Sequence, residues 1–590
     1  MSSCRRPIVL VLIVAGVGFG ACVGRRSGQG GGLAGGGGAG VGGGAGSTDD
    51  AGMASDNPRL PARVRRLTNA EYAASVFALL GVNAEAAVAG FPRDSTQRLG
   101  FTVNDAQIVS SVLAGQLDSA AHGMVAAARQ IGQFDLLAPC SDPTSDGEAC
   151  ARAFIQSFGA RAYRRPLTAE DIEPLFALYR AGAGEGGTYD AGIDFVTRAI
   201  LQAPSFVYLT ELGDSNAGSP AGTTTLTPHE IASQLSYLAT AGPPDRDLRD
   251  NVDALVTAAG REQQLRRLLP TLEARTRLVR LVREWLGIDA IAEIDKDSNV
   301  YPAFAAHHDA IVAESVSFID EVLGDGAGTL QELLGAEWTI ISDGASDDEV
   351  SAYYTDYYGV GAGGTATARI VLGGAAGGAR VGILNQGAFL SRFATATGSN
   401  PVARGVAVMR RLACLELPDP AELDINVIPP VPDPRTPKTT RALYAAHVAE
   451  SLCRTCHQSI DNFGFAFEQY DGMGAFRADR QEAVKTGAGV VSLPVDTATT
   501  VAGTGTDLDG DYADSNALAR ALSTSATVRA CMARQMFRAA AGRGDASVRG
   551  AEAHFVTQWQ LLPVDLQSSL IETLVAFVRS DVFVQRSTWP

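Results

Sequence analysis

The chain has 590 residues, of which 46% are hydrophobic, and its formal net charge at pH 7 is −17. A chain of this length exceeds what one hydrophobic core usually serves, so we expect several modules. No long block of Lys or Arg follows the N-terminus. Because phosphate binding needs a basic surface, this composition argues against a nucleic-acid partner.

Residues 1–22 predict an export signal. The pair Arg5-Arg6 gives a charged start, and residues 7–20 form an apolar run that is short for a membrane span. The run ends in Phe19-Gly20-Ala21-Cys22, which resembles a bacterial lipoprotein cleavage box and makes Cys22 the predicted lipidation site. An ordinary signal peptide cleaved nearby is the alternative. We therefore expect an exported protein, either periplasmic or held at the outer membrane or cell surface by a lipid anchor.

Residues 23–62 predict a flexible linker, because residues 28–46 are almost pure glycine. Such a stretch behaves as a random coil. A coil directly after a lipidation site would let the folded part stand away from the membrane.

Helix-start signals recur after the linker. Thr68, Thr168 and Thr227 each precede an acidic residue by three positions and then an apolar stripe of helical period. Further helices are predicted at residues 265–285 and 309–323. Strand-like alternation is limited to two short segments, at residues 339–342 and 370–372. We therefore predict a mainly α fold with little β structure.

The module boundaries follow from these elements and from one Pro-rich stretch. Repeated Pro cannot continue a helix, so residues 418–440 predict an extended linker. The predicted helical modules are residues 63–135, 136–215, 216–345, the loop-rich 346–417 and a C-terminal module, 441–590.

Four cysteines predict disulfides, because their number is even and the expected compartment is oxidising. Cys140 and Cys150 close a short loop, whereas Cys414 and Cys531 would join the helical body to the last module. Three pairings are open for the four residues, and buried free thiols are the alternative.

The C-terminal module contains Cys453-Arg454-Thr455-Cys456-His457, the attachment signature of c-type haem. On a helix, positions i, i+3 and i+4 share a face, so both thiols and the imidazole can reach one porphyrin. The predicted cofactor is therefore one covalent haem c, with His457 as ligand of the haem iron.

Other readings of this motif are less complete. A thioredoxin-type dithiol lies beside a βαβ pattern, and a zinc knuckle needs further ligands at short spacing; neither feature occurs here. A structural disulfide between Cys453 and Cys456 would leave His457 unexplained.

The sequence from Cys453 through Asp461 to Gly474 resembles the planctomycete- and myxobacterium-type cytochrome-like proteins. These proteins are built from the domains of unknown function 1587, 1595, 1592, 1588 and 1585. Other segments resemble the family in its order, namely residues 67–72, 163–167, 200–206, 284–287, 382–387 and 400–405. The chain departs from the pattern at Asn462, where Pro is usual, and at Asn400, where Ser is common.

The resemblance implies a haem-binding, extracytoplasmic protein without a settled substrate. Roles in carbohydrate breakdown are suspected for some relatives.

The second axial ligand stays open. Met473, Met532 and Met536 lie in the C-terminal module, and thioether ligation is what a low-spin electron carrier uses. Each Met also suits a hydrophobic core, His447 and His554 are less favoured, and an open or water-filled position is a further alternative.

The predicted function is single-electron transfer with an unknown redox partner protein, as an oxidoreductase component if the chain is part of an enzyme. The alternative is a surface lipoprotein for adhesion or for polysaccharide binding or breakdown, in which the helical body is the functional part. A two-haem peroxidase would need a second attachment motif.

Overall fold

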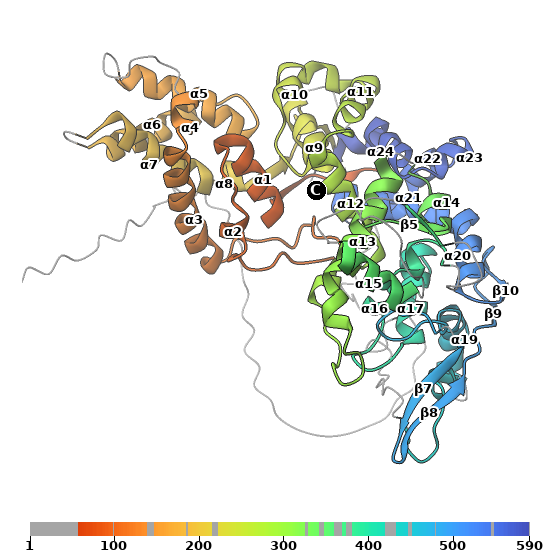
Figure 1. The fold of residues 1–590 in the computed structure, drawn as a ribbon. Helices are drawn as coiled ribbons and strands as arrows, with labels where there is room; N and C mark the ends of the chain where they lie inside the picture. The colour runs from red at the N-terminus through yellow and green to blue at the C-terminus, as the bar shows by residue number, and fades with distance from the viewer. Residues whose placement is uncertain are drawn as a thin grey trace, which may run out of the picture. The chain divides into compact units, whose positions relative to one another are not determined.

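The computed structural model describes residues 57–97, 100–137, 147–184, 187–214, 222–324, 328–341, 347–358, 369–372, 380–418, 432–445, 451–477, 479–543 and 548–588. Helices dominate these residues, so the predicted mainly α fold class is confirmed (Figure 1). The predicted export signal, Cys22, most of the glycine-rich linker, Cys140 and His447 lie outside the described residues.

All three predicted helix starts are capping boxes. Thr68 precedes α1 (Asn69–Leu80), Thr168 precedes α6 (Ala169–Ala183) and Thr227 precedes α9 (Pro228–Thr240). At Thr68 and Thr227 the hydroxyl accepts from the backbone N–H of the acidic residue, whose carboxylate accepts from the Thr N–H. At Thr168 both the hydroxyl and the N–H donate to the carboxylate of Asp171. A cap of this kind contributes about 1 kcal/mol to helix stability.

The other helices fall into two runs along the chain. The first run contains α2 (Glu85–Val88), α3 (Ser111–Gln130), α4 (Gln133–Leu137), α5 (Gly147–Tyr163), α7 (Tyr189–Gln202), α8 (Pro204–Val207), α10 (Arg246–Asp250), α11 (Ala258–Leu268), α12 (Leu272–Leu286), α13 (Phe304–Gly324), α14 (Leu330–Gly335) and α15 (Asp347–Tyr358). The second contains α16 (Gly387–Arg392), α17 (Pro401–Ala407), α18 (Thr440–Tyr444), α19 (Ser451–Phe465), α20 (Ser515–Thr524), α21 (Ala526–Ala541), α22 (Arg549–Trp559), α23 (Val564–Gln567), α24 (Leu570–Arg579) and α25 (Asp581–Val584). Short 3-10 helices lie at η1 (Val252–Val256), η2 (Asp289–Glu293) and η3 (Ile383–Asn385), and a π-helical turn, η4 (Val408–Leu412), extends α17.

The single helix predicted for residues 265–285 is wrong, because the structure has two helices there. α11 ends at Leu268 and α12 begins at Leu272, with Thr271 as its N-cap. Pro270 lies at the break, where it cannot donate the backbone hydrogen bond that a continuous helix needs. The other predicted helix, at residues 309–323, lies within α13.

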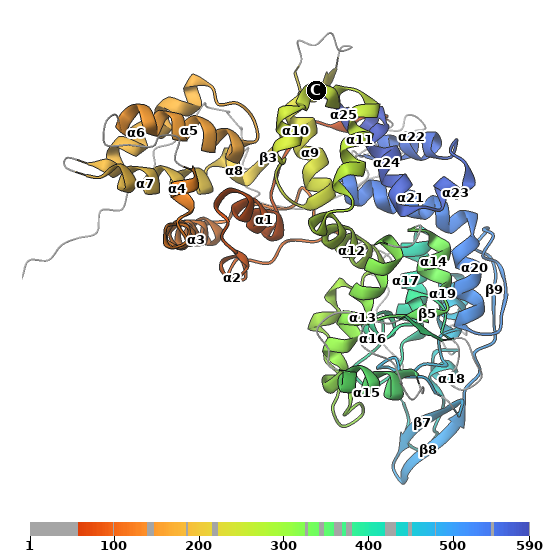
Figure 2. The same ribbon diagram turned by 45° about the horizontal axis from the view of Figure 1, so that its top comes forward.

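The strands are short and pair in small sheets. The two predicted strands pair with each other, as the antiparallel β5 (Trp338–Thr339) and β6 (Ile370–Val371). The remaining pairs are β2 (Arg63–Arg66) with β3 (Tyr208–Glu211), β7 (Gln481–Thr486) with β8 (Gly489–Pro494), and β9 (Thr499–Val501) with β10 (Gly510–Tyr512). The β7–β8 hairpin is the ribbon at the lower end of Figure 2.

One sheet joins the two ends of the described chain. β11 (Gln585–Ser587) pairs in parallel with β1 (Leu60–Pro61) and antiparallel with β4 (Thr223–Thr225). The N-terminal strand is therefore held by the last strand of the chain.

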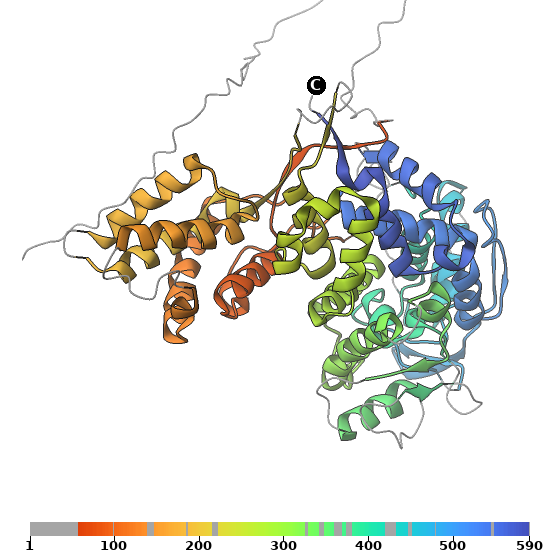
Figure 3. The same ribbon diagram turned by 90° about the horizontal axis from the view of Figure 1, so that it is seen from above.

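Buried apolar side chains form two clusters. The small core runs from Leu67 to Leu209 and includes Tyr237; there α5, α6 and α7 pack side by side (Figure 3). The large core runs from Leu226 to Phe583 and includes Leu60 and Phe101. The sequence-based module boundaries stay predictions. No helix of the described residues is both long and apolar enough to cross a membrane.

Candidate functional site

The Cys-x-x-Cys-His motif lies on α19, in the helical conformation that its spacing favours. This spacing therefore places Cys453, Cys456 and His457 on one face of the helix. Cys456 is a half-buried free thiol that packs against the large core. Cys456 is thus not part of a disulfide.

The ring of His457 is held by Asp461, one helical turn further along α19. His457 Nδ1 lies 2.9 Å from Asp461 Oδ1, and the Asp461 side chain is only 2% exposed. With the proton on Nδ1 donated to the carboxylate, the lone pair lies on Nε2, the tautomer that binds a metal ion. This pair is the local geometry expected of an axial histidine and its supporting acceptor.

Two polar side chains hold α19 against β9 and the loop that follows it. Ser459 donates to the carbonyl of Ala502 (3.0 Å), and Asn462 donates to the carbonyl of Thr500 (2.8 Å). Asn462 is the position at which the sequence departs from the family's usual Pro. Because Pro has no such donor, this departure supplies a contact between α19 and β9.

α19 also crosses α17 at very close range, and two glycines permit the approach. A Cβ atom built on Gly405 would lie 1.8 Å from the carbonyl oxygen of Ile460, and one on Gly464 would lie 1.8 Å from that of Pro401. No side chain fits between backbones at this distance. The crossing fixes the helix that carries the haem motif.

The segment after α19 is anchored by the buried Arg404, which directly precedes Gly405 on α17. Its guanidinium donates to the carbonyls of Leu390, Phe467 and Asp471. Burial lowers the pKa of Arg404 to about 10, so the side chain is charged at neutral pH. It lies 3.9 Å from the buried carboxylate of Glu468.

Glu468 has two further partners. Ser399 donates to it at 2.9 Å, and Arg477 lies 3.5 Å away. Burial raises the pKa of Glu468, and the charges of Arg477 and Arg404 act in the opposite direction. These buried charges connect the segment after α19 to α17.

The three Met candidates for the second axial position are all buried. Met473 lies in the anchored segment, where its carbonyl accepts from Ser391 and its N–H donates to Asp471. Met532 and Met536 lie on α21, which packs against η4, α22 and α24. His554 is partly exposed and lies 3.4 Å from Asp581. The identity of the second ligand stays a prediction.

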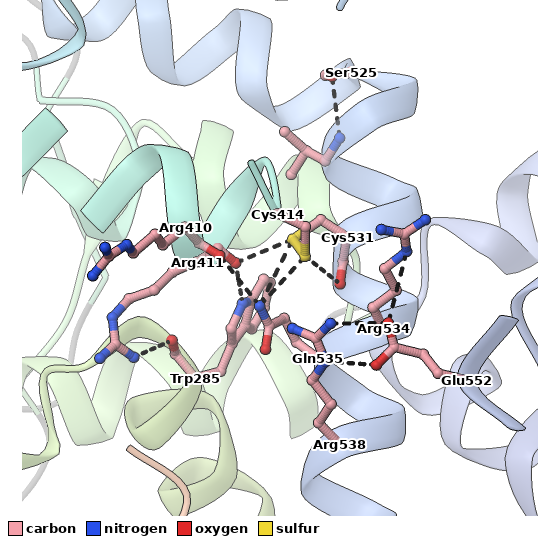
Figure 4. Close-up of a disulfide and its surroundings, with 11 residues drawn as sticks. Trp285, Arg410, Arg411, Cys414, Ser525, Cys531, Arg534, Gln535, Arg538 and Glu552 are labelled. Atoms are coloured by element: carbon pink, nitrogen blue, oxygen red, sulfur yellow. Dashed lines mark hydrogen bonds and ion pairs between the residues drawn. A yellow bond between two sulfur atoms is a disulfide. The ribbon is translucent and has the colours of Figure 1, made fainter. Parts of the chain in front are cut away.

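The disulfide predicted between Cys414 and Cys531 is present (Figure 4). It links the chain after η4 to α21, and Gln535 Nε2 lies 3.4 Å from Cys414 Sγ. A loop of about 100 residues closed in this way contributes about 5 kcal/mol in the chain-entropy model. The bridged residues are 117 positions apart, and the loop between them contains the whole haem motif, residues 453–457. Cys150 is buried in α5, and its predicted pairing with Cys140 stays a prediction.

Neither of two cavities among the described residues lies on the face of the motif. One of about 700 Å³ is lined by Arg441, Asn462, Thr499, Thr500, Asp511 and Tyr512, with Ala498 and Ala513. Asn462 follows His457 by five residues, a turn of about 140° around α19, so it faces another way. The other cavity, of about 410 Å³, lies between α2 and α3 and has Phe91 as its aromatic side chain. No cluster of three metal-binding side chains occurs among the described residues.

Asp461 and Arg404 were not identified as site residues from the sequence. The spacing of four residues between His457 and Asp461 could have indicated their contact. Nothing in the sequence around Arg404 shows that it is buried beneath the segment after α19.

Four family models match the chain in succession. They are described as "Protein of unknown function (DUF1587)" at residues 65–130, DUF1595 at 150–211, DUF1592 at 226–347 and DUF1588 at 380–480. The haem motif, Asp461, Arg404 and both crossing glycines lie within the last match. No curated protein and no solved structure matches the chain.

Proposed function

We propose that this chain, which belongs to the multidomain family built from the domains of unknown function 1587, 1595, 1592 and 1588, transfers single electrons through one covalently attached c-type haem. The observation that carries the proposal is the Cys453, Cys456 and His457 set on one helix, with the His457 ring held by a buried carboxylate. The model matched at residues 380–480 is named PSCyt3, which is compatible with a cytochrome-like domain.

The donor set fits a c-type haem. The thiols of Cys453 and Cys456 would form the two thioether links, and His457 Nε2 would supply one axial ligand. When bound, the haem supplies reversible one-electron chemistry. The chain's own part is to orient the imidazole through Asp461 and to hold α19 by the Gly405–Gly464 crossing.

The remaining parts of the proposal come from the sequence. An export signal with lipidation at Cys22 would place the protein outside the cytoplasm, where c-type haem is attached, and would anchor it to a membrane. The redox partner would be another protein. Within this chain, Met473, Met532 and Met536 are the candidates for the second ligand of the haem iron.

The polysaccharide alternative has weaker support. An aromatic-lined groove in the helical body would favour it, because sugar rings stack on aromatic faces. The described cavity in that region, between α2 and α3, has one aromatic side chain, Phe91. Electron transfer through the haem is therefore the function that the structure supports better.

The test is a pyridine haemochrome spectrum of the full chain, exported by a host that attaches c-type haem. We expect a c-type spectrum that is lost in the Cys453→Ala/Cys456→Ala variant. The matched control is Cys414→Ala/Cys531→Ala, which also removes two cysteines, both outside the motif, but should keep the haem. A haem-free wild-type protein, or equal haem in the motif variant, would refute the proposal.

A further inference from the structure

The His457–Asp461 pair differs from an ordinary ion pair on a helix surface. A pair at i, i+4 in water contributes only a few tenths of a kcal/mol, because solvent screens it. Here the Asp461 side chain is 2% exposed and His457 is 23% exposed. The carboxylate therefore acts on the imidazole through the protein interior, in which its electrostatic effect is stronger than it would be in bulk water.

The pair also cannot separate easily. Both side chains belong to α19, so the helical backbone fixes their spacing. Ser459 and Asn462, which lie on either side of Asp461, bond the helix to the carbonyls of Ala502 and Thr500. The fold therefore keeps the Asp461 carboxylate within hydrogen-bond distance of His457 Nδ1.

The field of Asp461 reaches the neighbouring helix as well. Burial raises the pKa of the Tyr444 hydroxyl on α18, and the negative charges of Glu468 and Asp461 raise it further.

A carboxylate that accepts the Nδ1 proton increases electron donation from Nε2, because negative charge on the acceptor gives the imidazole anionic character. A more basic axial ligand stabilises ferric over ferrous iron, and hydrogen bonds to ligands are one means by which proteins set haem potentials. A neutral acceptor has this effect to a smaller degree.

We infer that Asp461 is a positioning residue that holds His457 in the Nδ1–H tautomer and lowers the reduction potential of the haem bound there. The inference rests on the proposed function. It makes this haem a readier electron donor than one whose axial histidine bonds a neutral acceptor.

The first experiment is a redox titration of the haem-loaded full chain and its Asp461→Asn variant. Removal of a second-shell partner typically costs about 10–100-fold in metal affinity or activity. We expect the equilibrium constant for reduction to rise about tenfold in Asp461→Asn, which corresponds to about 59 mV for a one-electron couple. Asp461→Glu, which keeps the carboxylate, should stay near the wild-type potential.

The matched control is Asp511→Asn, which removes the same charge from an exposed residue of the same module. Its potential should equal that of the wild type. A potential that does not change in Asp461→Asn, or that changes equally in Asp511→Asn, would overturn the inference while leaving the haem in place. Absence of haem from the wild-type protein would overturn both proposals.

The second experiment does not need the haem. In the full chain with Cys453→Ala/Cys456→Ala, nitrogen NMR of the His457 ring at pH 8 should show the Nδ1–H tautomer. Adding Asp461→Ala should remove that preference, because neutral imidazole otherwise exchanges between both tautomers. An unchanged tautomer would show that Asp461 does not position the ring.

Discussion

Arg404 shows how much of the candidate site depends on single buried residues. Its guanidinium donates to two carbonyls of the segment after α19 and to the carbonyl of Leu390 on α16. It also lies beside the buried Glu468. Breaking a buried charge pair from one side leaves the other charge uncompensated, which is more costly than the loss of a surface pair.

We therefore expect Arg404→Met to lower the free energy of unfolding by about 3–5 kcal/mol. The measurement is urea denaturation followed by circular dichroism. Arg520→Met is the control, because Arg520 pairs with Glu337 where both side chains are about half exposed. Its effect should be below about 1 kcal/mol. Equal effects of the two substitutions would contradict the role assigned to Arg404.

At the residue scale, the sequence predicted the Cys414–Cys531 disulfide that the structure contains, but not which charged residues are buried. The haem motif has a fixed spacing, and the even count of cysteines predicted disulfides, with Cys414–Cys531 among the pairings that it left open. Arg404 and Glu468 are ordinary charged residues in the sequence. Their burial depends on which distant segments pack over them, so no local pattern could have shown it.

At the scale of elements, the crossing of α17 and α19 is the contact that positions the motif. The closest approach places the carbonyl of Ile460 where a side chain on residue 405 would begin. A methyl group there must push the helices apart, and overpacking of this kind costs about 1–3 kcal/mol.

Gly405→Ala should accordingly destabilise the protein by about 1–3 kcal/mol and reduce the fraction of chains that carry haem. Gly115→Ala on α3 is the matched control, because nothing lies within 4 Å of its added Cβ. There Ala should be neutral or stabilise the exposed helix by up to about 1 kcal/mol. Thermal unfolding and haem content of both variants give the comparison, and a harmless Gly405→Ala would contradict the proposed crossing.

The elements themselves were predicted unevenly, for local reasons. The three capping boxes were identified because Thr and an acid at fixed spacing satisfy the first N–H groups of a helix. The break at Pro270 was missed, since the apolar period continues across it. The β7–β8 hairpin was missed as well, because its strands are mostly exposed and lack the alternation that marks a half-buried strand.

At the scale of the whole molecule, Glu211 connects the beginning and the end of the described chain. On β3, it accepts from Arg63 of β2 at 2.5 Å and from Arg586 of β11 at 2.7 Å. Burial opposes ionisation of Glu211, but the charges of Arg63 and Arg586 outweigh it and hold its pKa well below the usual range.

This lowered pKa predicts how stability depends on pH. A carboxyl group whose pKa is lower in the folded state stabilises the fold above its unfolded pKa, which is about 4.3 for Glu. That contribution is lost as the pH falls from about 4.3 toward the lower folded value. Denaturation between pH 3 and pH 7 should show this loss in the wild type and a smaller one in Glu211→Gln. A steeper loss in Glu211→Gln would contradict the assignment.

The mainly α class and the succession of family domains could be predicted from helical period and motifs. The division into two cores could not, because it depends on packing between distant segments. Leu60, for example, joins the large core through the pairing of β1 with β11. No periodicity near Leu60 indicates a partner at the other end of the chain.

The central claim is tested most directly by the intact mass of the exported full chain under denaturing conditions, beside its Cys453→Ala/Cys456→Ala variant. Our account predicts that the wild-type chain exceeds the variant by one haem, after correction for the two substitutions, and that denaturation does not remove it. Equal corrected masses would contradict covalent haem attachment at this motif.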